Sequence, residues 1–343
     1  MSIQIINPLT YPNYDAMLLE RNDSSIFHSS SWARVLNKAY NYKPLYFSNF
    51  ENGNFKTLLA LMEVKSFLTG SRAVSLPFTD YCHPLYSENK EFEALFDKLT
   101  LCGRKAKWKT CEIRGEASFH ANPSPFSYYY LHELKLKSNK KNIFSKFRSS
   151  TRRNIVKAEK SGVTADVCHS WESLREFYRL HCLTRRGHGI PPQPFYFFEE
   201  IYKHIISPEH GFVVLARYNS KPIAGAVYFH FGRKAVYKYG ASNRKFLHLR
   251  ANNLVMWTAI KWYFQNGFES FSFGRTDLNH TGLLQFKRGW ATQERIIHYF
   301  KYDLVRQCFV KERPKKQILY SFIRRIPEPV LILTGRLLYR YMG

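Results

Sequence analysis

The order of strand-like and helical segments constrains the fold of this chain more than any other feature. Alternating apolar residues between turn signals indicate strands, whereas apolar residues at three- and four-residue spacing indicate helices. In the first part of the chain, strand character covers residues 42–50, 56–64, 72–77, 109–113 and 128–136. Helical spacing covers residues 90–101, and Glu51-Asn52-Gly53-Asn54 is a hairpin turn signal. Strands in a meander with crossing helices predict a mixed α/β layer architecture.

The same kind of pattern begins again after residue 137. A polar stretch over 138–142 precedes apolar residues from Ile143 to Ala158, which predict one helix that closes at Gly162. Further strands are expected over 163–167, 211–217, 221–231, 235–240 and 268–273, and further helices over 171–182, 195–206 and 251–264. We therefore expect two domains, residues 1–137 and 138–305, and a basic tail over 306–343.

The charge balance limits the partners that suit this chain. Its 343 residues include 52 Lys and Arg against 26 Asp and Glu, which gives a formal net charge of +26 at pH 7. Such an excess favours nucleic acid, anionic lipid surfaces and phosphorylated substrates, although a lysine-rich surface can also serve solubility alone.

Cysteine usage and hydropathy indicate the compartment. The six cysteines form no CxxC pair and no Cys/His spacing suits zinc, so we expect reduced thiols and no metal site. We also expect no secretory leader, because the start of the chain is polar and rich in proline. No apolar run reaches the ~18 residues that a membrane span needs, and a cytoplasmic protein is therefore predicted.

A lysine between aromatic residues is the first candidate for chemistry. The motif Phe273-Gly274-Arg275-Thr276 ends a strand-like run in a glycine turn, and Phe286-Lys287-Arg288-Gly289-Trp290 follows ten residues later. A cation held among aromatic rings after a strand can meet a developing oxyanion or a phosphate. The spacing also suits an ordinary lysine stem whose ammonium reaches water, and both interpretations stay open at this point.

Two arginine pairs are candidates for anion binding. Arg152 and Arg153 lie in the densest basic cluster, and Arg185 and Arg186 precede the loop Gly187-His188-Gly189-Ile190-Pro191-Pro192. Paired guanidinium groups suit bidentate phosphate capture, but a solvated helix face and a flexible loop would have the same composition. His188 is a candidate general base, although a loop histidine is more often structural.

Several common catalytic signatures are absent from the sequence. No nucleophile elbow, HExxH motif, P-loop or GxGxxG motif occurs. Nucleophilic and metal catalysis therefore have no positive support. A reaction that needs only positioning and charge stabilisation remains compatible with the sequence.

Seven short motifs follow one another in an order that is more specific than any one of them. They cover residues 27–32, 76–81, 152–163, 184–192, 239–242, 273–275 and 282–287. With these motifs, the span from about residue 26 to residue 303 resembles the FemABX-like aminoacyl- and acyltransferases. The resemblance implies a mixed α/β (α+β) fold with two GNAT-like domains in tandem, followed here by the basic helical tail.

The resemblance also implies an activity and a site. Members of the family join an amino acid, delivered on tRNA, to an amine of a cell-wall precursor, and others are uncharacterised N-acyltransferases. Lys287, preceded by Phe286, matches the place of the family's functional lysine, which would stabilise a tetrahedral oxyanion. The candidate substrate-binding residues are Phe286, Arg275, Arg152, Arg153, Arg185, Arg186, Trp32, Asp80 and Tyr239.

The donor and the acceptor stay open in the sequence. A CoA-using GNAT fold needs a Gly-rich turn before a helix to hold pyrophosphate, whereas residues 248–254 contain no glycine. We expect no bound cofactor, and aminoacyl-tRNA or acyl-CoA as donor, with acetyl-CoA disfavoured. The leading acceptor is a phosphorylated or lipid-linked envelope precursor. The alternatives are a CoA-dependent enzyme acting on an amino sugar or small amine, and a non-catalytic scaffold that binds RNA or membrane.

The tail has the composition of an amphipathic segment. Its apolar stripe consists of Ile318, Phe322, Ile326, Val330, Leu331, Leu337 and Leu338, with breaks at Pro327 and Pro329. Around the stripe lie Arg324, Arg325, Arg336 and Arg340. Such a helix can rest on an anionic membrane surface, which would make the protein peripheral on the inner face, or it can dock on the second domain.

Overall fold

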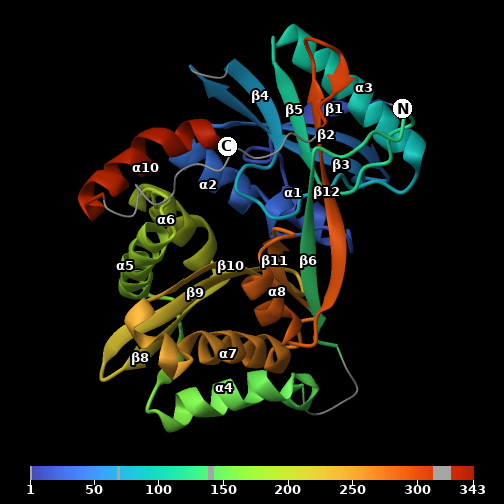
Figure 1. The fold of residues 1–343 in the computed structure, drawn as a ribbon. Helices are drawn as coiled ribbons and strands as arrows, with labels where there is room; N and C mark the ends of the chain where they lie inside the picture. Colours follow the sequence, from blue (N-terminus) through green and yellow to red (C-terminus); the bar gives the residue numbers. More distant parts are fainter. Residues whose placement is uncertain (1, 68–69, 138–142, 312–325) are drawn as a thin grey trace. The chain divides into compact units, whose positions relative to one another are not determined.

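The computed structural model describes residues 2–67, 70–137, 143–311 and 326–343 of the chain. Contacts divide the chain into two compact units, each of which has a β-sheet with helices packed on it (Figure 1). The first unit comprises Met1–Tyr129, Ile296–Lys316 and Leu338–Gly343. The second unit comprises Tyr130–Arg295 and Gln317–Leu337.

The first unit contains a sheet with the strand order β1-β2-β3-β4-β5-β12. Its strands are β1 (Gln4–Ile6), β2 (Lys43–Glu51), β3 (Asn54–Ser66), β4 (Gly70–Ser75), β5 (Thr110–Arg114), β12 (Gln293–Asp303) and β13 (Cys308–Phe309). Its helical segments are α1 (Tyr14–Leu19), η1 (Ile26–His28), α2 (Ser30–Tyr40) and α3 (Asn89–Lys105). Helix α3 buries Phe92, Leu95 and Leu99 against the sheet, as the apolar spacing over 90–101 predicts.

Strand β12 explains why the units differ from the expected boundaries at residues 137 and 305. Its residues Tyr299 to Asp303 pair antiparallel with Arg114 to Thr110 of β5. Backbone hydrogen bonds of this ladder hold the segment in the first unit, although it follows the second unit in the sequence. A pairing between segments so far apart in the sequence leaves no local signal for the boundary.

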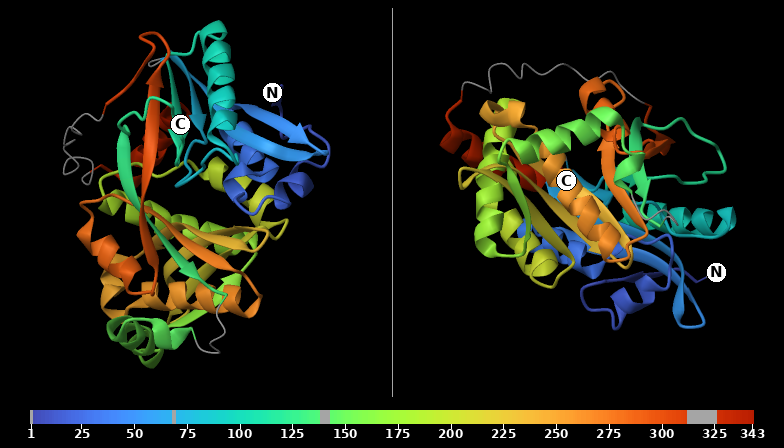
Figure 2. Two further views of the ribbon diagram at one scale, coloured as in Figure 1. Left: turned by 90° about the vertical axis from the view of Figure 1, so that its right-hand side faces the viewer. Right: turned by 90° about the horizontal axis from the view of Figure 1, so that it is seen from below.

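The second unit has the strand order β6-β11-β10-β9-β8-β7. Its strands are β6 (Ser127–Lys135), β7 (Thr164–Cys168), β8 (Gly211–Tyr218), β9 (Lys221–Phe231), β10 (Lys234–Ser242) and β11 (Ser270–Thr276). Its helical segments are η2 (Phe144–Lys146), α4 (Ser149–Lys160), α5 (Trp171–Gly187), α6 (Phe195–Ile201), η3 (Tyr202–Ile206), η4 (Arg244–Leu249), α7 (Ala251–Gln265) and α8 (Thr281–Arg288). Helices α7 and α5 cover opposite faces of β8 and β9, and α4 packs on the outer side of α7 (Figures 1 and 2).

Two parallel strands separate in the middle of the second unit's sheet. β10 and β11 pair only from Lys234 with Ser270 to Val236 with Ser272. Beyond these pairs, β10 shifts register against β9 between Tyr237 and Tyr239, and β11 shifts against β6 after Ser272. Such bulges bend and twist a strand locally, and here they fall where the two strands part. The end of β10, beyond these pairs, lines the site described below.

One expected helix was wrong. Instead of a single helix from Ile143, the chain forms the short turn η2, leaves helical geometry at Phe147 (ψ 151°), and starts again as α4. Phe147 is buried against Trp257 and Trp290, at ring-centroid distances of 5.7 and 5.0 Å. Burial of this aromatic ring in the core outweighs continuation of the helix. Gly162 follows α4 with φ 78°, in agreement with its expected place after the helix.

The tail ends in helix α10 (Glu328–Met342), which has one buried face. Leu331, Gly335 and Tyr339 are buried, at helical spacing. In the second unit a side chain at Gly335 would overlap the main-chain oxygen of Pro192, and in the first unit the Tyr42 hydroxyl donates to the main-chain oxygen of Tyr339. Part of the tail therefore docks on the protein.

Part of the predicted amphipathic tail falls outside the described residues. Ile318, Phe322, Arg324 and Arg325 lie outside the described residues. Within the described residues, no helix is long and apolar enough to cross a membrane.

Candidate functional site

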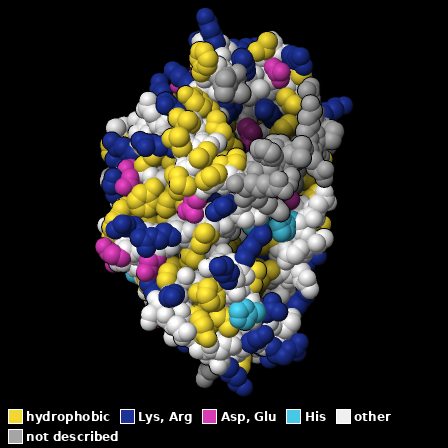
Figure 3. All heavy atoms as spheres, turned by 60° about the vertical axis from the view of Figure 1, so that its left-hand side comes forward, with side chains coloured by type: hydrophobic (Ala, Val, Ile, Leu, Met, Phe, Trp, Pro, Cys, Tyr) yellow, Lys and Arg dark blue, Asp and Glu magenta, His cyan; other side chains and the backbone are white. Residues whose placement is uncertain are grey.

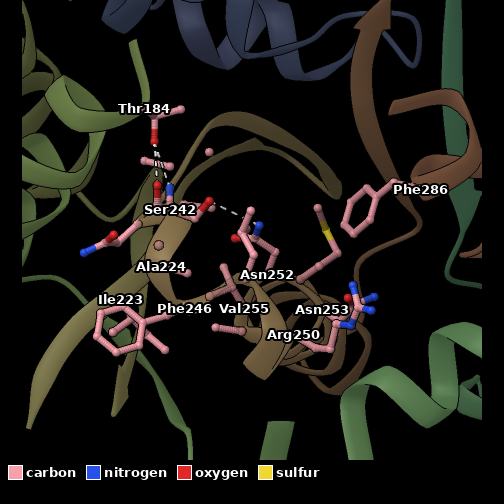
Figure 4. Close-up of a pocket in the computed structure, with 18 of the residues that line it drawn as sticks. Thr184, Ile223, Ala224, Ser242, Phe246, Arg250, Asn252, Asn253, Val255 and Phe286 are labelled. Atoms are coloured by element: carbon pink, nitrogen blue, oxygen red, sulfur yellow. Dashed lines mark hydrogen bonds between the residues drawn. The ribbon is translucent and has the colours of Figure 1, made fainter. Parts of the chain in front are cut away.

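A pocket of about 520 Å³ lies in the second unit against β9 and the end of β10 (Figure 4). Its walls come from β9, β10, η4, the first two turns of α7, and α8. Ala224, Gly225 and Ala226 of β9 form an apolar floor, because their small side chains leave the space open. Phe286 enters from α8 on the opposite side from Thr184 and Ser242. An apolar cavity with a few polar groups is typical of a small-molecule site.

The polar wall of the pocket is held by hydrogen bonds between three elements. The Thr184 hydroxyl of α5 donates to the main-chain oxygen of Ser242 at 3.1 Å and accepts from its main-chain nitrogen at 2.9 Å. The Asn252 side-chain amide of α7 donates to the Ser242 hydroxyl at 3.4 Å. These bonds fix the end of β10 between α5 and α7, so the polar rim is pre-formed.

The N-terminus of α7 lines the pocket, and the turn before it contains no glycine. Arg250 takes the left-handed conformation (φ 60°, ψ 25°) at the start of the helix. Leu249 is buried in the core and is not part of the pocket lining. The first amides of a helix lack intrahelical acceptors and favour an anion, so this rim can meet a phosphate group.

Lys287 lies in the last turn of α8 and is only 2% exposed. Its ammonium donates to the main-chain oxygens of Gly274 at 2.7 Å and Arg275 at 3.1 Å. Gly274 has φ 67° within the β11 bulge, a conformation that glycine adopts at little cost. The two motifs at residues 273–276 and 286–290 are therefore in direct contact. Lys287 itself does not line the pocket, whereas its neighbour Phe286 does.

A buried histidine and a carboxylate lie beside this turn. His132 Nε2 donates to Glu294 Oε2 at 2.8 Å, and Arg288 forms a bidentate pair with the same carboxylate at 2.7 and 2.8 Å. Burial, followed by the positive charge of Lys287, lowers the pKa of His132, which is therefore neutral near pH 7. The Arg288 hydrogen bonds lower the pKa of Glu294. This network ties the end of α8 to β6.

The expected arginines do not gather at the pocket. Arg152 and Arg153 lie on α4, where they line a separate shallow basin of about 740 Å³ together with Lys157 and Lys160. Arg185 donates to the main-chain oxygen of Pro191 at 3.3 Å. Its neighbours Thr184 and His188 line the pocket, whereas Arg185 and Arg186 do not.

Three further expected residues lie away from the pocket walls. Tyr239 packs among His181, Phe197 and Phe198 on the α5 and α6 side of the sheet. Trp32 and Asp80 belong to the first unit, where Trp32 is fully buried beside Phe27 and the Asp80 main-chain oxygen accepts from the Tyr299 hydroxyl at 2.6 Å. Of the ten expected site residues, Phe286 alone is part of the pocket lining.

The structure adds residues that sequence reasoning missed. Thr184 and Ser242 were inside quoted motifs but were not singled out, and His280, the N-cap of α8, lines the pocket. His132 and Glu294 lie 162 positions apart and carry no local signal. Within the described residues, no group of three or more His, Cys, Asp or Glu is placed to hold a metal ion.

Comparison with known proteins places this site in a recognised domain. Residues 145–288 match the family described as acetyltransferase (GNAT) domain, and all residues lining the pocket fall within this range. The Lipid II:glycine glycyltransferase of Staphylococcus aureus (strain USA300) is 33% identical over 121 residues, which cover 34% of this chain and 27% of the relative. The Staphylococcus saprophyticus enzyme of the same name is 26% identical over 121 residues. The matched stretch thus spans about a quarter of the length of these relatives.

Solved structures extend the similarity to the whole fold. A crystal structure of FemX superimposes with a TM-score of 0.70 and 15% identity, over 95% of this chain and 100% of that chain. The resemblance to the FemABX-like acyltransferases is confirmed. A tandem GNAT protein from the clavulanic acid biosynthesis pathway aligns with a TM-score of 0.57 and 8% identity, over 88% of this chain and 98% of that chain. The expected mixed α/β fold with two GNAT-like domains in tandem is therefore confirmed.

Proposed function

We propose that this chain is an N-acyl or aminoacyl transferase that forms an amide on an amine of a cell-envelope precursor, either peptidoglycan or another glycan. The pocket carries the proposal, because an open cavity lined by β9, β10, the start of α7 and α8 lies entirely within the GNAT-matched residues. A non-catalytic scaffold would be expected to have a filled cleft instead. The names of the glycyltransferase relatives, which act on Lipid II, supply the class of acceptor.

The proposed reaction is attack of an uncharged amine on the carbonyl of an activated ester or thioester. The nitrogen–carbon bond forms, the donor's oxygen or sulfur leaves with the electron pair, and the proton lost by the amine ends on that leaving oxygen or sulfur. Lys287 contributes a fixed positive charge, since two main-chain oxygens hold its ammonium next to Phe286 in the sequence. The role proposed for this fixed charge is to stabilise the oxyanion of the tetrahedral intermediate, from a position behind Phe286 of the pocket wall.

We propose aminoacyl-tRNA as the donor. The formal net charge of +26 suits a polyanionic donor, and the α4 basin formed by Arg152, Arg153, Lys157 and Lys160 offers distributed positive charge. The rim at Asn252 and Ser242 would hold the polar end of the donor, with the apolar floor beneath the transferred group.

A CoA-dependent N-acyltransferase acting on an amino sugar or small amine is the second candidate. One observation favours it: the α7 N-terminus faces the pocket, and Arg250 supplies the left-handed turn without glycine. A pyrophosphate needs such helix amides. The two candidates share the acyl transfer and differ in the donor.

Mass spectrometry of envelope precursors from cells with and without this protein tests the function. We expect a precursor population that carries an added amino-acid or acyl mass only when the protein is present. The purified protein is then given the unmodified precursor with either aminoacyl-tRNA or acyl-CoA, and the donor that yields the same mass increment is assigned. Identical precursor spectra in both cell types, with no transfer from either donor, would reject the proposal.

A further inference from the structure

Helix α10 carries an exposed apolar stripe opposite its buried face. Val330, Leu333 and Leu337 are 50%, 54% and 60% exposed, and the same helix continues with exposed Leu338 and Met342. Val330, Leu333 and Leu337 recur at intervals of three and four residues, which places them along one side of the helix, whereas Leu338 and Met342 fall nearer its buried side. On the face of the molecule turned toward the viewer in Figure 3, hydrophobic side chains gather in a patch among Lys and Arg.

The opposite side of α10 is fixed to the protein and cannot turn to hide this stripe. Leu331 and Gly335 are buried, Gly335 lies against the main chain of Pro192, and the Tyr196 hydroxyl donates to the main-chain oxygen of Arg336 at 3.5 Å. Because a docked helix keeps its orientation, the leucines on its free side remain directed at solvent. A contiguous exposed apolar stripe of this kind marks an interaction surface.

Charge selects the partner. Arg336 and Arg340 are exposed on the same helix, whose one acidic residue is Glu328. The chain as a whole carries a formal charge of +26. A second copy would bring arginines against arginines, which like-charge repulsion opposes, whereas an anionic lipid surface satisfies both the leucines and the arginines.

We propose that α10 docks this protein on the surface of an anionic lipid membrane, with its exposed stripe entering the boundary between headgroups and acyl chains. The 15-residue helix would lie in the plane of the surface, as interfacial amphipathic helices do. The arginines meet the lipid phosphates at the edge of the stripe. This inference goes beyond the proposed transfer reaction, and its test does not depend on that activity.

Vesicle flotation of the full chain tests the proposal. The probes are vesicles of phosphatidylcholine with phosphatidylglycerol, and vesicles of phosphatidylcholine alone, at physiological salt. We expect flotation with the anionic vesicles and at least about tenfold weaker partitioning to the zwitterionic ones. Leu333→Ser with Leu337→Ser should weaken anionic partitioning by about 10- to 100-fold, the scale of removing two apolar side chains from an interfacial helix.

Matched variants distinguish docking through α10 from nonspecific hydrophobic adsorption to the vesicles. Leu183→Ser with Leu101→Ser removes two leucines of similar exposure, 43% and 45%, on α5 and α3, and should leave partitioning unchanged. Arg336→Gln with Arg340→Gln should lower anionic binding by about tenfold. Wild-type protein that does not float overturns the proposal. So does a dimer in light scattering that the Leu333 and Leu337 changes abolish, since the stripe would then be a self-association surface.

Discussion

Lys287 and Gly274 form the contact that joins the two halves of the sequence motif. The lysine ammonium donates to the main-chain oxygen of Gly274 at 2.7 Å, from the last turn of α8 to the bulge of β11. The bulge interrupts the ladder with β6 and leaves carbonyl oxygens for the lysine. The last turn of α8, which also carries Phe286 of the pocket wall, is thereby attached to the sheet.

Replacing this lysine tests its proposed role in catalysis. Lys287→Met should lower turnover by about 10²–10³-fold, the scale of losing one oxyanion-stabilising group. The change also removes two buried hydrogen bonds, so we expect the free energy of unfolding to fall by about 1–3 kcal/mol. Turnover is measured by the mass assay at a temperature where both proteins are folded. Lys261→Met, at an exposed position of α7, is the control, and near-normal turnover of Lys287→Met would remove the lysine from the mechanism.

Glu294 should stabilise the end of α8 more than a surface carboxylate does. Glu294→Gln removes the charge that His132 and Arg288 share, and we expect the melting temperature to fall by about 2–5 °C. Glu269→Gln breaks only the exposed pair with Lys137 and should shift it by less than about 1 °C. Differential scanning calorimetry compares the two variants. Equal shifts in melting temperature would show that the hydrogen bond to buried His132 does not increase the contribution of Glu294 to stability.

Acid should destabilise the fold through buried histidines. Burial lowers the pKa of His181 to about 3 and that of His230 to about 4, from an ordinary value of 6.5. Below pH 6.5 the unfolded chain binds protons that the folded chain does not, so the free energy of unfolding falls as pH drops from 7 to 5. Each fully shifted histidine contributes about 2 kcal/mol to this loss.

Urea unfolding at pH 7 and pH 5 measures that dependence. His181→Gln should make it shallower, because the proton uptake of the unfolded chain at this position disappears. His120→Gln, at a side chain that is 97% exposed, should leave the dependence as it is in the wild type. A wild-type free energy that does not change between the two pH values would contradict the assignment of neutral buried histidines.

The α4 basin should bind anions through charge rather than shape. Arg152→Ala with Arg153→Ala is expected to raise the Michaelis constant for a phosphorylated or RNA substrate by about tenfold at low salt. The difference should shrink as salt rises, because screening weakens exposed charges. Arg233→Ala with Arg306→Ala removes two exposed arginines elsewhere and serves as the control. A Michaelis constant that is unchanged at every ionic strength would exclude the basin from substrate binding.

Acetyl-CoA should bind weakly or not at all. Arg250 adopts the left-handed conformation without glycine, so the backbone conformation itself does not disfavour CoA. Weak binding is expected because the long Arg250 side chain lies at the pocket rim, where a glycine would let the backbone approach a pyrophosphate. Isothermal titration calorimetry with CoA and acetyl-CoA measures this directly. Micromolar binding at physiological salt would favour the CoA-dependent alternative over the tRNA-dependent one.

Local sequence patterns predicted most of the regular structure. Strands β2, β3, β8 and β9 and helices α3, α5 and α7 lie where alternation, helical spacing and turn residues indicated them. The turn at Asn52 has positive φ, in agreement with its hairpin signal. Helices α2 and α8 were not identified beforehand, and the helix at Ile143 was broken by burial of Phe147.

The sequence by itself determined the alternating architecture, the positive charge and the motif pair at Gly274 and Lys287. The tertiary structure decided what these features do. In the folded unit the buried Lys287 ammonium donates hydrogen bonds to two main-chain carbonyl oxygens, and Phe286 lines the pocket. The tertiary structure also brought His132 to Glu294. These outcomes depend on strand pairing and bulges between distant segments, and such contacts are fixed by packing of the whole unit rather than by local preference.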